Sequence, residues 1–342
     1  MTHYNLALIG FGNVGRSFAR LLLRKEHELK EHYGITFTIT TIATGSHGVA
    51  LDRSGLDIEQ ALKLVEAGLS LSALSAQPVP ADTLELIHTC GADVLFENTP
   101  VNYQTGQPAV DHLHMALECG MHAITANKGP VVHAYRPLTE LAASKGRKFF
   151  FESAVMDGAP IFSLFRGALP AARLIAFRGV LNSTTNLILT RMENGESFDE
   201  AVRFAQKIGV AETDPSGDID GWDASVKVAA LVTVLMDTPL VPAEVDRQGI
   251  RQITAEEIAR AKVNGKRWKL VCSARRAEGG IQVKVAPELV VMDSPMFSVE
   301  GTTSIVQFET DVLGLLSVVE SNPGPDTTAY GLLADFINAV RT

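Results

Sequence analysis

The sequence predicts an α/β protein with a doubly wound parallel sheet in its first half and a second domain of the α+β class. Two patterns support this prediction. In the first 150 residues, short apolar runs alternate with amphipathic segments, as in strands joined by right-handed helical crossovers. After about residue 150, helical segments dominate and longer strand-like runs follow them. The length of 342 residues also suits two domains, since a domain usually has about 100–200 residues.

Five strands are expected in the first half, each a short apolar or Thr-rich run: residues 6–9, 37–43, 93–96, 122–125 and 148–151. Helices are expected between them, at 14–23, at the apolar residues 61–65, and at 108–119 and 138–144. Asp57 stands three residues before Gln60, a spacing typical of a helix start, because the Asp57 side chain can accept from a backbone N–H left free there. Gly120 is expected to end the helix before it.

The second half is expected to begin with helices and to continue with strands. The apolar spacing predicts helices at 161–167, 185–192, 198–207, 224–236 and 255–261, and strands at 269–274, 281–285 and 304–308. A last helix is expected at 327–340. By pattern alone, this last helix could belong to either domain.

Composition and charge favour a globular protein that acts on a small ligand. Hydrophobic residues make up 46% of the chain and charged residues 20%. Thirty Lys and Arg against 39 Asp and Glu give a net charge of −9, whereas proteins that bind nucleic acid or anionic membranes usually carry a basic surplus. We therefore expect neither nucleic acid nor a membrane as a partner.

Cysteine usage and hydropathy indicate a cytoplasmic protein. Cys90, Cys119 and Cys272 are scattered and odd in number, without the spacing of a zinc site or a disulfide framework. The N-terminus lacks the basic-then-apolar pattern of a signal peptide. Apolar runs such as 228–236 are much shorter than the roughly 18 residues that a membrane span needs.

A glycine-rich motif follows the first expected strand and opens the first helix. Its residues are Gly10, Phe11, Gly12, Asn13, Val14 and Gly15. In such a motif the first glycine permits a tight turn, the second allows the backbone to approach a pyrophosphate, and the third allows helix and strand to pack closely. Strand, glycines and helix stand in the required order, so the motif predicts a Rossmann-type dinucleotide site.

The end of the second strand normally contacts the adenosine ribose, and here it leaves the cofactor open. An acid at this point favours NAD and an Arg favours NADP. The segment 43–48 contains neither, and the first Arg after it is Arg53. Ser46 and His47 could bind a 2′-phosphate, or they could be ordinary turn residues.

Polar residues follow the third and fourth strands, at the edge where doubly wound sheets bind their ligands. Thr99 lies in the segment after the third strand, and Lys128 follows the fourth. A lysine at such an edge could contact a substrate carbonyl or the nicotinamide. Taken singly, each segment could equally be a solvated loop.

The densest polar cluster runs from residue 209 to 227, where five carboxylates lie in a loop that leads into a helix. Asp223 and Lys227 are four residues apart, so they share one face of that helix. Partial burial would lower the pKa of Lys227 while the carboxylate beside it would raise that pKa, and proton-donating lysines combine such opposing effects. The alternative is a solvated acidic loop with a surface ion pair.

Together these segments resemble homoserine dehydrogenase. The similarity is carried by 205–227, by 10–15, by Thr125-Ala126-Asn127-Lys128-Gly129-Pro130, and by Gly179-Val180-Leu181-Asn182-Ser183-Thr184-Thr185-Asn186. The resemblance implies reduction of L-aspartate 4-semialdehyde to L-homoserine with NAD(P)H, in threonine and methionine biosynthesis. It also implies a short form without a regulatory domain, and hence no allosteric inhibition by threonine.

The resemblance further implies a role for several residues. Lys227 would donate the proton, and Lys128 would lie beside substrate and cofactor. Glu212 and Asp223 would bind the substrate, and Asp218 would support the site. Gly209 and Gly324 would join the cofactor-binding residues Gly10–Gly15, Ser46, His47, Thr99 and Lys128. A sodium or potassium ion would bind mainly through main-chain carbonyls at the positions of Glu152, Val155, Asp157 and Ala159.

The expected architecture has a dinucleotide domain at 1–150 with 311–342 packed back onto it, and a substrate and dimerisation domain at 151–310. A homodimer or a higher homo-oligomer is therefore expected. NADP is slightly favoured over NAD, because Ser46 and His47 can meet a phosphate. Two other functions stay open on the residues alone: another two-domain dehydrogenase of amino-acid metabolism, and a non-catalytic dinucleotide sensor.

Overall fold

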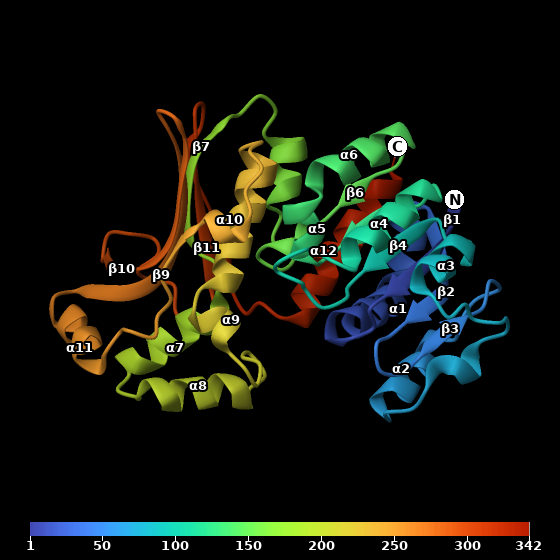
Figure 1. Cartoon of the computed structure of the whole chain (residues 1–342), viewed down its shortest axis with the longest axis horizontal. Coiled ribbons are helices and arrows are strands. Elements are labelled where there is room, and N and C mark those ends of the chain that lie inside the picture. The colour runs from blue at the N-terminus through green and yellow to red at the C-terminus, as the bar shows by residue number, and fades with distance from the viewer. Residues whose placement is uncertain (342) are drawn as a thin grey trace. The chain divides into compact units, whose positions relative to one another are not determined.

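The computed structural model describes residues 1–341 and divides the chain into two compact units. The first unit comprises Met1–Pro160 and the chain from Gly324 onward, and the second is Ile161–Pro323 (Figure 1). The chain passes from the first unit to the second after residue 160 and returns at residue 324, whereas the sequence predicts these boundaries at 150 and 311. The reason at the second position is that β12 (Gly314–Glu320) pairs with β11 (Ser304–Thr310) inside the sheet of the second unit.

The first unit contains a six-stranded sheet of order β3-β2-β1-β4-β5-β6. Its strands are β1 (Thr2–Ile9), β2 (Ile35–Ala43), β3 (Val49–Leu51), β4 (Val94–Glu97), β5 (His122–Thr125) and β6 (Phe149–Phe150). All pairs are parallel except β2 with β3. The fold class is confirmed, and the five predicted strands pair in parallel. The strand β3 was not predicted; it adds an antiparallel edge, because the short turn before it can join only antiparallel strands.

The helices of this unit are α1 (Asn13–Tyr33), α2 (Ile58–Glu66), α3 (Thr83–Thr89), α4 (Ala109–Glu118), α5 (Lys128–His133), α6 (Tyr135–Ser144) and α12 (Pro325–Val340). The Asp57 side chain accepts from the Gln60 N–H at 2.9 Å, which confirms the predicted start of α2. In one core cluster, Phe96 of β4 stacks with Phe18 of α1 and Phe336 of α12, at centroid distances of 4.4 and 5.9 Å. The C-terminal helix α12 thus packs beside α1 on the sheet (Figure 1).

The backbone of α12 touches the segment that follows β6. A Cβ on Gly158 would lie 2.2 Å from the Thr327 carbonyl oxygen, so these two backbone segments are in direct contact, with no side chain between them. Ser153 Oγ donates to the Thr328 carbonyl at 2.7 Å, and the Glu152 N–H donates to Asp335 at 2.6 Å. These contacts attach the last helix to the first unit.

The second unit contains a sheet of order β12-β11-β7-β9-β10-β8. Its other strands are β7 (Leu174–Val180), β8 (Asp246–Arg247), β9 (Lys266–Ala277) and β10 (Gly280–Val291). All pairs are antiparallel except β8 with β10. The helices are α7 (Ser183–Glu193), α8 (Phe198–Lys207), α9 (Ser216–Ile219), α10 (Trp222–Leu235) and α11 (Ala255–Val263). The helix expected at 161–167 is present over 162–168, but from Leu164 to Ala168 it is π-helical.

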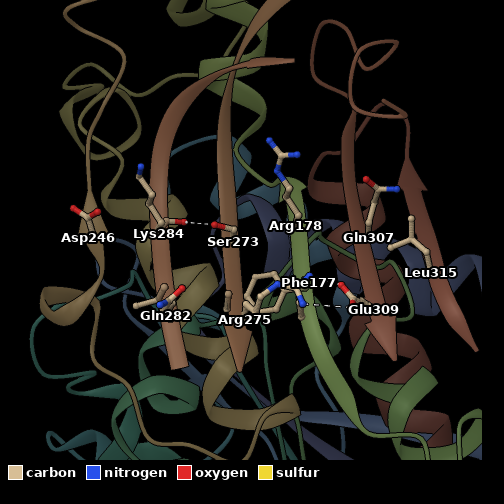
Figure 2. A pocket seen from close by; sticks show the side chains of 13 residues that line it. Phe177, Arg178, Asp246, Ser273, Arg275, Gln282, Lys284, Gln307, Glu309 and Leu315 are labelled. Carbon is tan, nitrogen blue, oxygen red and sulfur yellow. Dashed lines mark hydrogen bonds and ion pairs between the residues drawn. The ribbon is translucent and has the colours of Figure 1, made fainter. Parts of the chain in front are cut away.

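Helices α7, α10 and α11 pack against β9. Polar and charged side chains of the central strands, among them Arg178, Ser273 and Lys284, line a hollow on this sheet (Figure 2). The three cysteines are free. Within residues 1–341, every helix is too short or too polar to span a bilayer.

Candidate active site

The glycine motif forms the turn between β1 and α1. Gly10 has φ 92°, and a Cβ there would lie 2.4 Å from the carbonyl carbon of Asn98. A Cβ on Gly15 would lie 2.4 Å from the Gly10 oxygen, so helix and strand are in backbone contact. Gly12 is the N-cap residue of α1, and a Cβ on it would point into open space. The loop therefore leaves room for a phosphate at the helix N-terminus, where free N–H groups favour an anion.

The carboxyl ends of β4 and β5 are tied to each other beside this loop. The Asn127 side chain donates to the Thr99 carbonyl at 3.0 Å and accepts from the Gly129 N–H at 2.9 Å. Thr99 in turn donates its N–H to the buried Glu97 carboxylate. Lys128 is the first residue of α5, directly after the Asn127 cap. Lys128 therefore lies just beyond the carboxyl end of β5, at the edge of the sheet where the sequence predicts it.

The turn after β2 carries Ser46 and His47, whose side chains lie 2.8 Å apart. The His47 N–H donates to Thr44 Oγ1 at 2.7 Å, which fixes the turn. The Arg53 guanidinium donates to the Thr89 carbonyl. The cationic group that the sequence offered for a 2′-phosphate is therefore engaged with the main chain, and Ser46 and His47 remain.

The four positions suggested for a cation lie in the segment that contacts α12. Val155 is buried, and the residues Met156 and Asp157 have φ of 52° and 46°. The Asp157 carboxylate accepts from the hydroxyls of Thr327 and Thr328 at 3.3 and 3.1 Å. The Asp157 side chain is thus turned to the start of α12, and the oxygens left for an ion at this position are those of the main chain.

Gly324 begins α12, and its carbonyl accepts from both threonine hydroxyls of the first turn. A Cβ on Gly324 would again point into open space.

In the second unit, a lysine and three polar side chains converge at the start of α10. The Lys227 ammonium lies 3.0 Å from the Asp223 carboxylate and donates to the Leu181 carbonyl at 2.7 Å. The Lys227 side chain is 15% exposed, so most of it is covered by the surrounding protein. Asp223 stands in the first turn of α10, where the helix dipole favours a carboxylate. The spacing of four residues predicted this pair, and the structure confirms it.

Asn182 connects the carboxylates of this cluster. Its amide nitrogen donates to Asp218 at 2.6 Å and to Asp223 at 3.0 Å. Burial, together with the charge of Asp223, raises the pKa of the Asp218 carboxyl, and the hydrogen bond from Asn182 opposes this shift. The cluster therefore contains two neighbouring carboxylates and an ammonium group, which suits the binding of a charged substrate and the transfer of a proton.

The loop that carries Asp218 is held by arginines of the following segment. Arg251 pairs with Asp220, and Arg247 donates to the Asp220 carbonyl while its guanidinium lies 3.7 Å from the Trp222 ring centroid. Glu212 lies on the exposed part of the same loop, and its carbonyl accepts from Gln206. The structure therefore brings Asp218, Asp223 and Lys227 together and leaves the Glu212 side chain facing solvent.

Gly209 has φ 75° and ends the turn after α8, where only glycine is unstrained.

Two residues of these sites were not predicted. Asn182 stands in one of the motifs quoted above, but its link to Asp218 and Asp223 spans 36 and 41 residues and leaves no local signal. Arg16 lies in the first turn of α1 and donates to Asn13, in a hollow that Pro325 also lines. Its place directly after the third glycine was the signal that could have identified it.

Two family models match the chain. The model for homoserine dehydrogenase covers residues 160–337, and the model for the NAD-binding domain of homoserine dehydrogenase covers residues 10–152. The chain is 36% identical to the NAD(+)-dependent homoserine dehydrogenase of Pseudomonas canavaninivorans over 339 residues, which is 99% of this chain and 96% of the relative.

Solved structures resemble the chain over nearly its whole length. A putative homoserine dehydrogenase from Archaeoglobus fulgidus matches with a TM-score of 0.86 and 28% identity, covering 98% of each chain. A hyperthermophilic archaeal homoserine dehydrogenase in complex with NADPH matches with a TM-score of 0.83 and 28% identity, covering 99% of this chain and 98% of that one.

Proposed function

The chain belongs to the homoserine dehydrogenase family and is an NAD(P)-dependent oxidoreductase; we propose that Lys227 supplies the proton when it reduces L-aspartate 4-semialdehyde to L-homoserine. The observation that carries this assignment is the ammonium of Lys227, which is held by Asp223 and the Leu181 carbonyl in a side chain that is only 15% exposed. The bound nicotinamide supplies the hydride, and the protein must supply the proton.

Lys227 is suited to give that proton to the aldehyde oxygen. Its ammonium is held between the Asp223 carboxylate, at 3.0 Å, and the Leu181 carbonyl, at 2.7 Å, and an ammonium is a proton donor by nature. A positioned general acid of this kind accelerates a reaction by typically about 10²–10⁴-fold. Lys128, at the start of α5, is assigned to orient substrate and cofactor.

The carboxylates are assigned to the ammonium group of the substrate. Asp223 and Glu212 are the proposed contacts, and Asp218 supports them through the shared Asn182 amide. The exposed position of Glu212 leaves its side chain free to meet a substrate that enters from solvent.

For the cofactor, we propose NADP with weak discrimination against NAD. The glycine loop Gly10–Gly15 fits a pyrophosphate, because Gly12 opens into free space at the N-terminus of α1. Thr99, Gly209 and Gly324 complete the proposed contacts. At the 2′-position, Ser46 and His47 offer donors but no fixed positive charge, since the Arg53 guanidinium is bonded to Thr89. A 2′-phosphate would therefore gain less here than beside an arginine.

A monovalent cation is proposed at Glu152, Val155, Asp157 and Ala159. Oxygen donors suit sodium or potassium, and the engaged Asp157 side chain leaves its main-chain carbonyl for this purpose. If the ion assists the enzyme, turnover rises when sodium or potassium replaces a bulky organic cation at equal ionic strength.

A homodimer is proposed through the sheet of the second unit. The hollow on this sheet is lined by Arg178, Arg275, Lys284, Gln307 and Glu309 (Figure 2). Helices pack against this sheet, and an antiparallel sheet can leave its other face in solvent or cover it with another layer. A second copy related by twofold symmetry would bring the same mixture of cationic and anionic side chains to the hollow, so opposite charges could pair.

The reaction is tested by mixing the protein with L-aspartate 4-semialdehyde and either NADPH or NADH, while following the absorbance of the reduced cofactor. We expect consumption with both, faster at low NADPH than at low NADH. Absence of turnover with either cofactor would contradict the assigned reaction. A strong preference for NADH would contradict only the assignment of Ser46 and His47.

A further inference from the structure

Asn182 uses the two ends of its amide for two different purposes. It is 3% exposed and is the N-cap residue of α7, where its oxygen accepts from the Thr185 N–H at 2.8 Å. Its nitrogen donates to Asp218 Oδ1 at 2.6 Å and to Asp223 Oδ2 at 3.0 Å. An amide nitrogen carries two hydrogens, so each carboxylate receives one.

The same Asp223 oxygen also faces the Lys227 ammonium, at 3.0 Å. The residue before Asn182 completes the arrangement, because the Leu181 carbonyl accepts from Lys227 at 2.7 Å. Two consecutive residues at the start of α7 therefore hold both carboxylates and the lysine.

We propose that Asn182 is a positioning residue, which keeps the carboxylates of Asp218 and Asp223 side by side and ionised and, through Asp223, orients the Lys227 ammonium. This inference rests on the proposed role of Lys227 as proton donor. Asn182 itself need not touch the substrate.

The physical reason is the repulsion between the two carboxylates. Two like charges in a half-buried place favour protonation of one of them, and burial and Asp223 raise the pKa of Asp218. A donor shared by both favours the charged forms and reduces the repulsion. The other charged group that acts on Asp218 is Lys227, which lowers its pKa. The nearby Cys272 thiol stays neutral, because burial raises its pKa to about 12.

Two substitutions separate the bridging from the helix cap. Asn182→Ser keeps an oxygen that caps a helix well but is too short to bridge the carboxylates. Asn182→Asp keeps shape and cap while it replaces the donor with a third negative charge. Ser197→Ala is the matched control, since Ser197 caps α8 in the same way through the Glu200 N–H and lies outside the cluster.

The experiment is the pH profile of kcat/KM for homoserine oxidation. The acid limb should move to higher pH in Asn182→Ser, and further in Asn182→Asp, because the carboxylates lose a donor that favours their charged form. In Asn182→Ser, kcat/KM should fall by at least about tenfold, as expected when a hydrogen bond to a charged group is lost. Ser197→Ala should keep the acid limb of the unmodified protein.

An acid limb that stays in place in the folded Asn182 variants overturns the proposal, whatever happens to kcat, because a merely structural loss would leave the pH dependence unchanged. If Asn182→Ser does not fold, Asn182→Asp decides alone, since its cap and volume are retained. Lys227→Ala, measured in parallel, separates the two claims. Full turnover in that variant contradicts the proton donor, and an unmoved acid limb with a Lys227-dependent rate contradicts Asn182 only.

Discussion

Lys227 differs from an ordinary surface lysine, because its side chain is only 15% exposed and its ammonium is held in place. The Asp223 carboxylate and the Leu181 carbonyl fix the ammonium, so little reorganisation is needed when a proton is transferred. The neighbouring Asp218 has a raised pKa, and a shifted pKa at a cluster of polar groups is typical of functional sites.

Lys227→Ala is expected to lower kcat by about 10²–10⁴-fold, because the general acid is lost. NADPH binding, measured by quenching of the cofactor fluorescence, should stay intact. Lys128→Ala is the comparison, and more of its loss should appear in KM, as expected for lost positioning. If folded Lys227→Ala keeps more than about half of the turnover, the proton donor is another group, and Lys128 is the next candidate.

Asp218→Asn is expected to stabilise the fold at neutral pH while it reduces activity. The folded pKa of Asp218 lies above its unfolded value, so the folded state binds more protons, and stability falls as pH rises through the window above the ordinary Asp pKa of about 4. Asp218→Asn has no carboxyl group to ionise at this position, so it does not lose this part of the stability as pH rises. Thermal unfolding of both proteins from acid to neutral pH should give curves that separate as pH rises. Parallel curves would mean that Asp218 ionises in the fold without penalty.

The turn between β1 and α1 depends on backbone contacts that only glycine allows. Gly15 touches the Gly10 carbonyl, and Gly10 touches the backbone after β4. The second unit has a comparable contact at Gly249, where a Cβ would lie 2.2 Å from the Ile219 oxygen. These close approaches fix where the loops stand relative to the strands, and so where phosphate donors or carboxylates can point.

Gly12→Ala and Gly15→Ala form a matched pair for this turn. A Cβ on Gly12 meets nothing within 4 Å, so the variant should unfold at the normal temperature, yet its methyl group enters the space proposed for the pyrophosphate. Cofactor affinity should fall by roughly tenfold or more, about 1.4 kcal/mol. A Cβ on Gly15 lies 2.4 Å from the Gly10 oxygen, so that variant should lose both stability and affinity. Normal NADPH affinity in Gly12→Ala would contradict the cofactor position.

The sheet of the second unit presents charged side chains in register across its central strands. Arg275 pairs with Glu309, and Arg178 with Glu288, while Gln282 stands opposite Arg275. Charged side chains such as these can be solvated by water. In the proposed homodimer, the hollow that they line (Figure 2) would instead hold side chains of the second copy.

Gln282→Arg is expected to weaken the proposed homodimer, because it adds a cation to the hollow that both copies would turn toward each other, and like charges across an interface are costly. Sedimentation velocity should show a dissociation constant raised by at least about tenfold, or 1.4 kcal/mol. Gln60→Arg, the same change on the exposed side of α2, should leave association unchanged. Unaltered association of Gln282→Arg would place the dimer contact elsewhere.

Local sequence patterns determined the α/β class, the glycine turn, the cap of α2 and the pairing of Asp223 with Lys227, because each depends on residues within one turn or one strand. Tertiary structure decided the rest. The strand β12 alternates between exposed and half-buried residues and is ordered by its register with β11, so its own pattern is weak. Asn182 reaches Asp218 and Asp223 only because β7, α9 and α10 fold together. Contacts between residues distant in sequence arise from packing of several elements at once, and no periodicity within a single element records them.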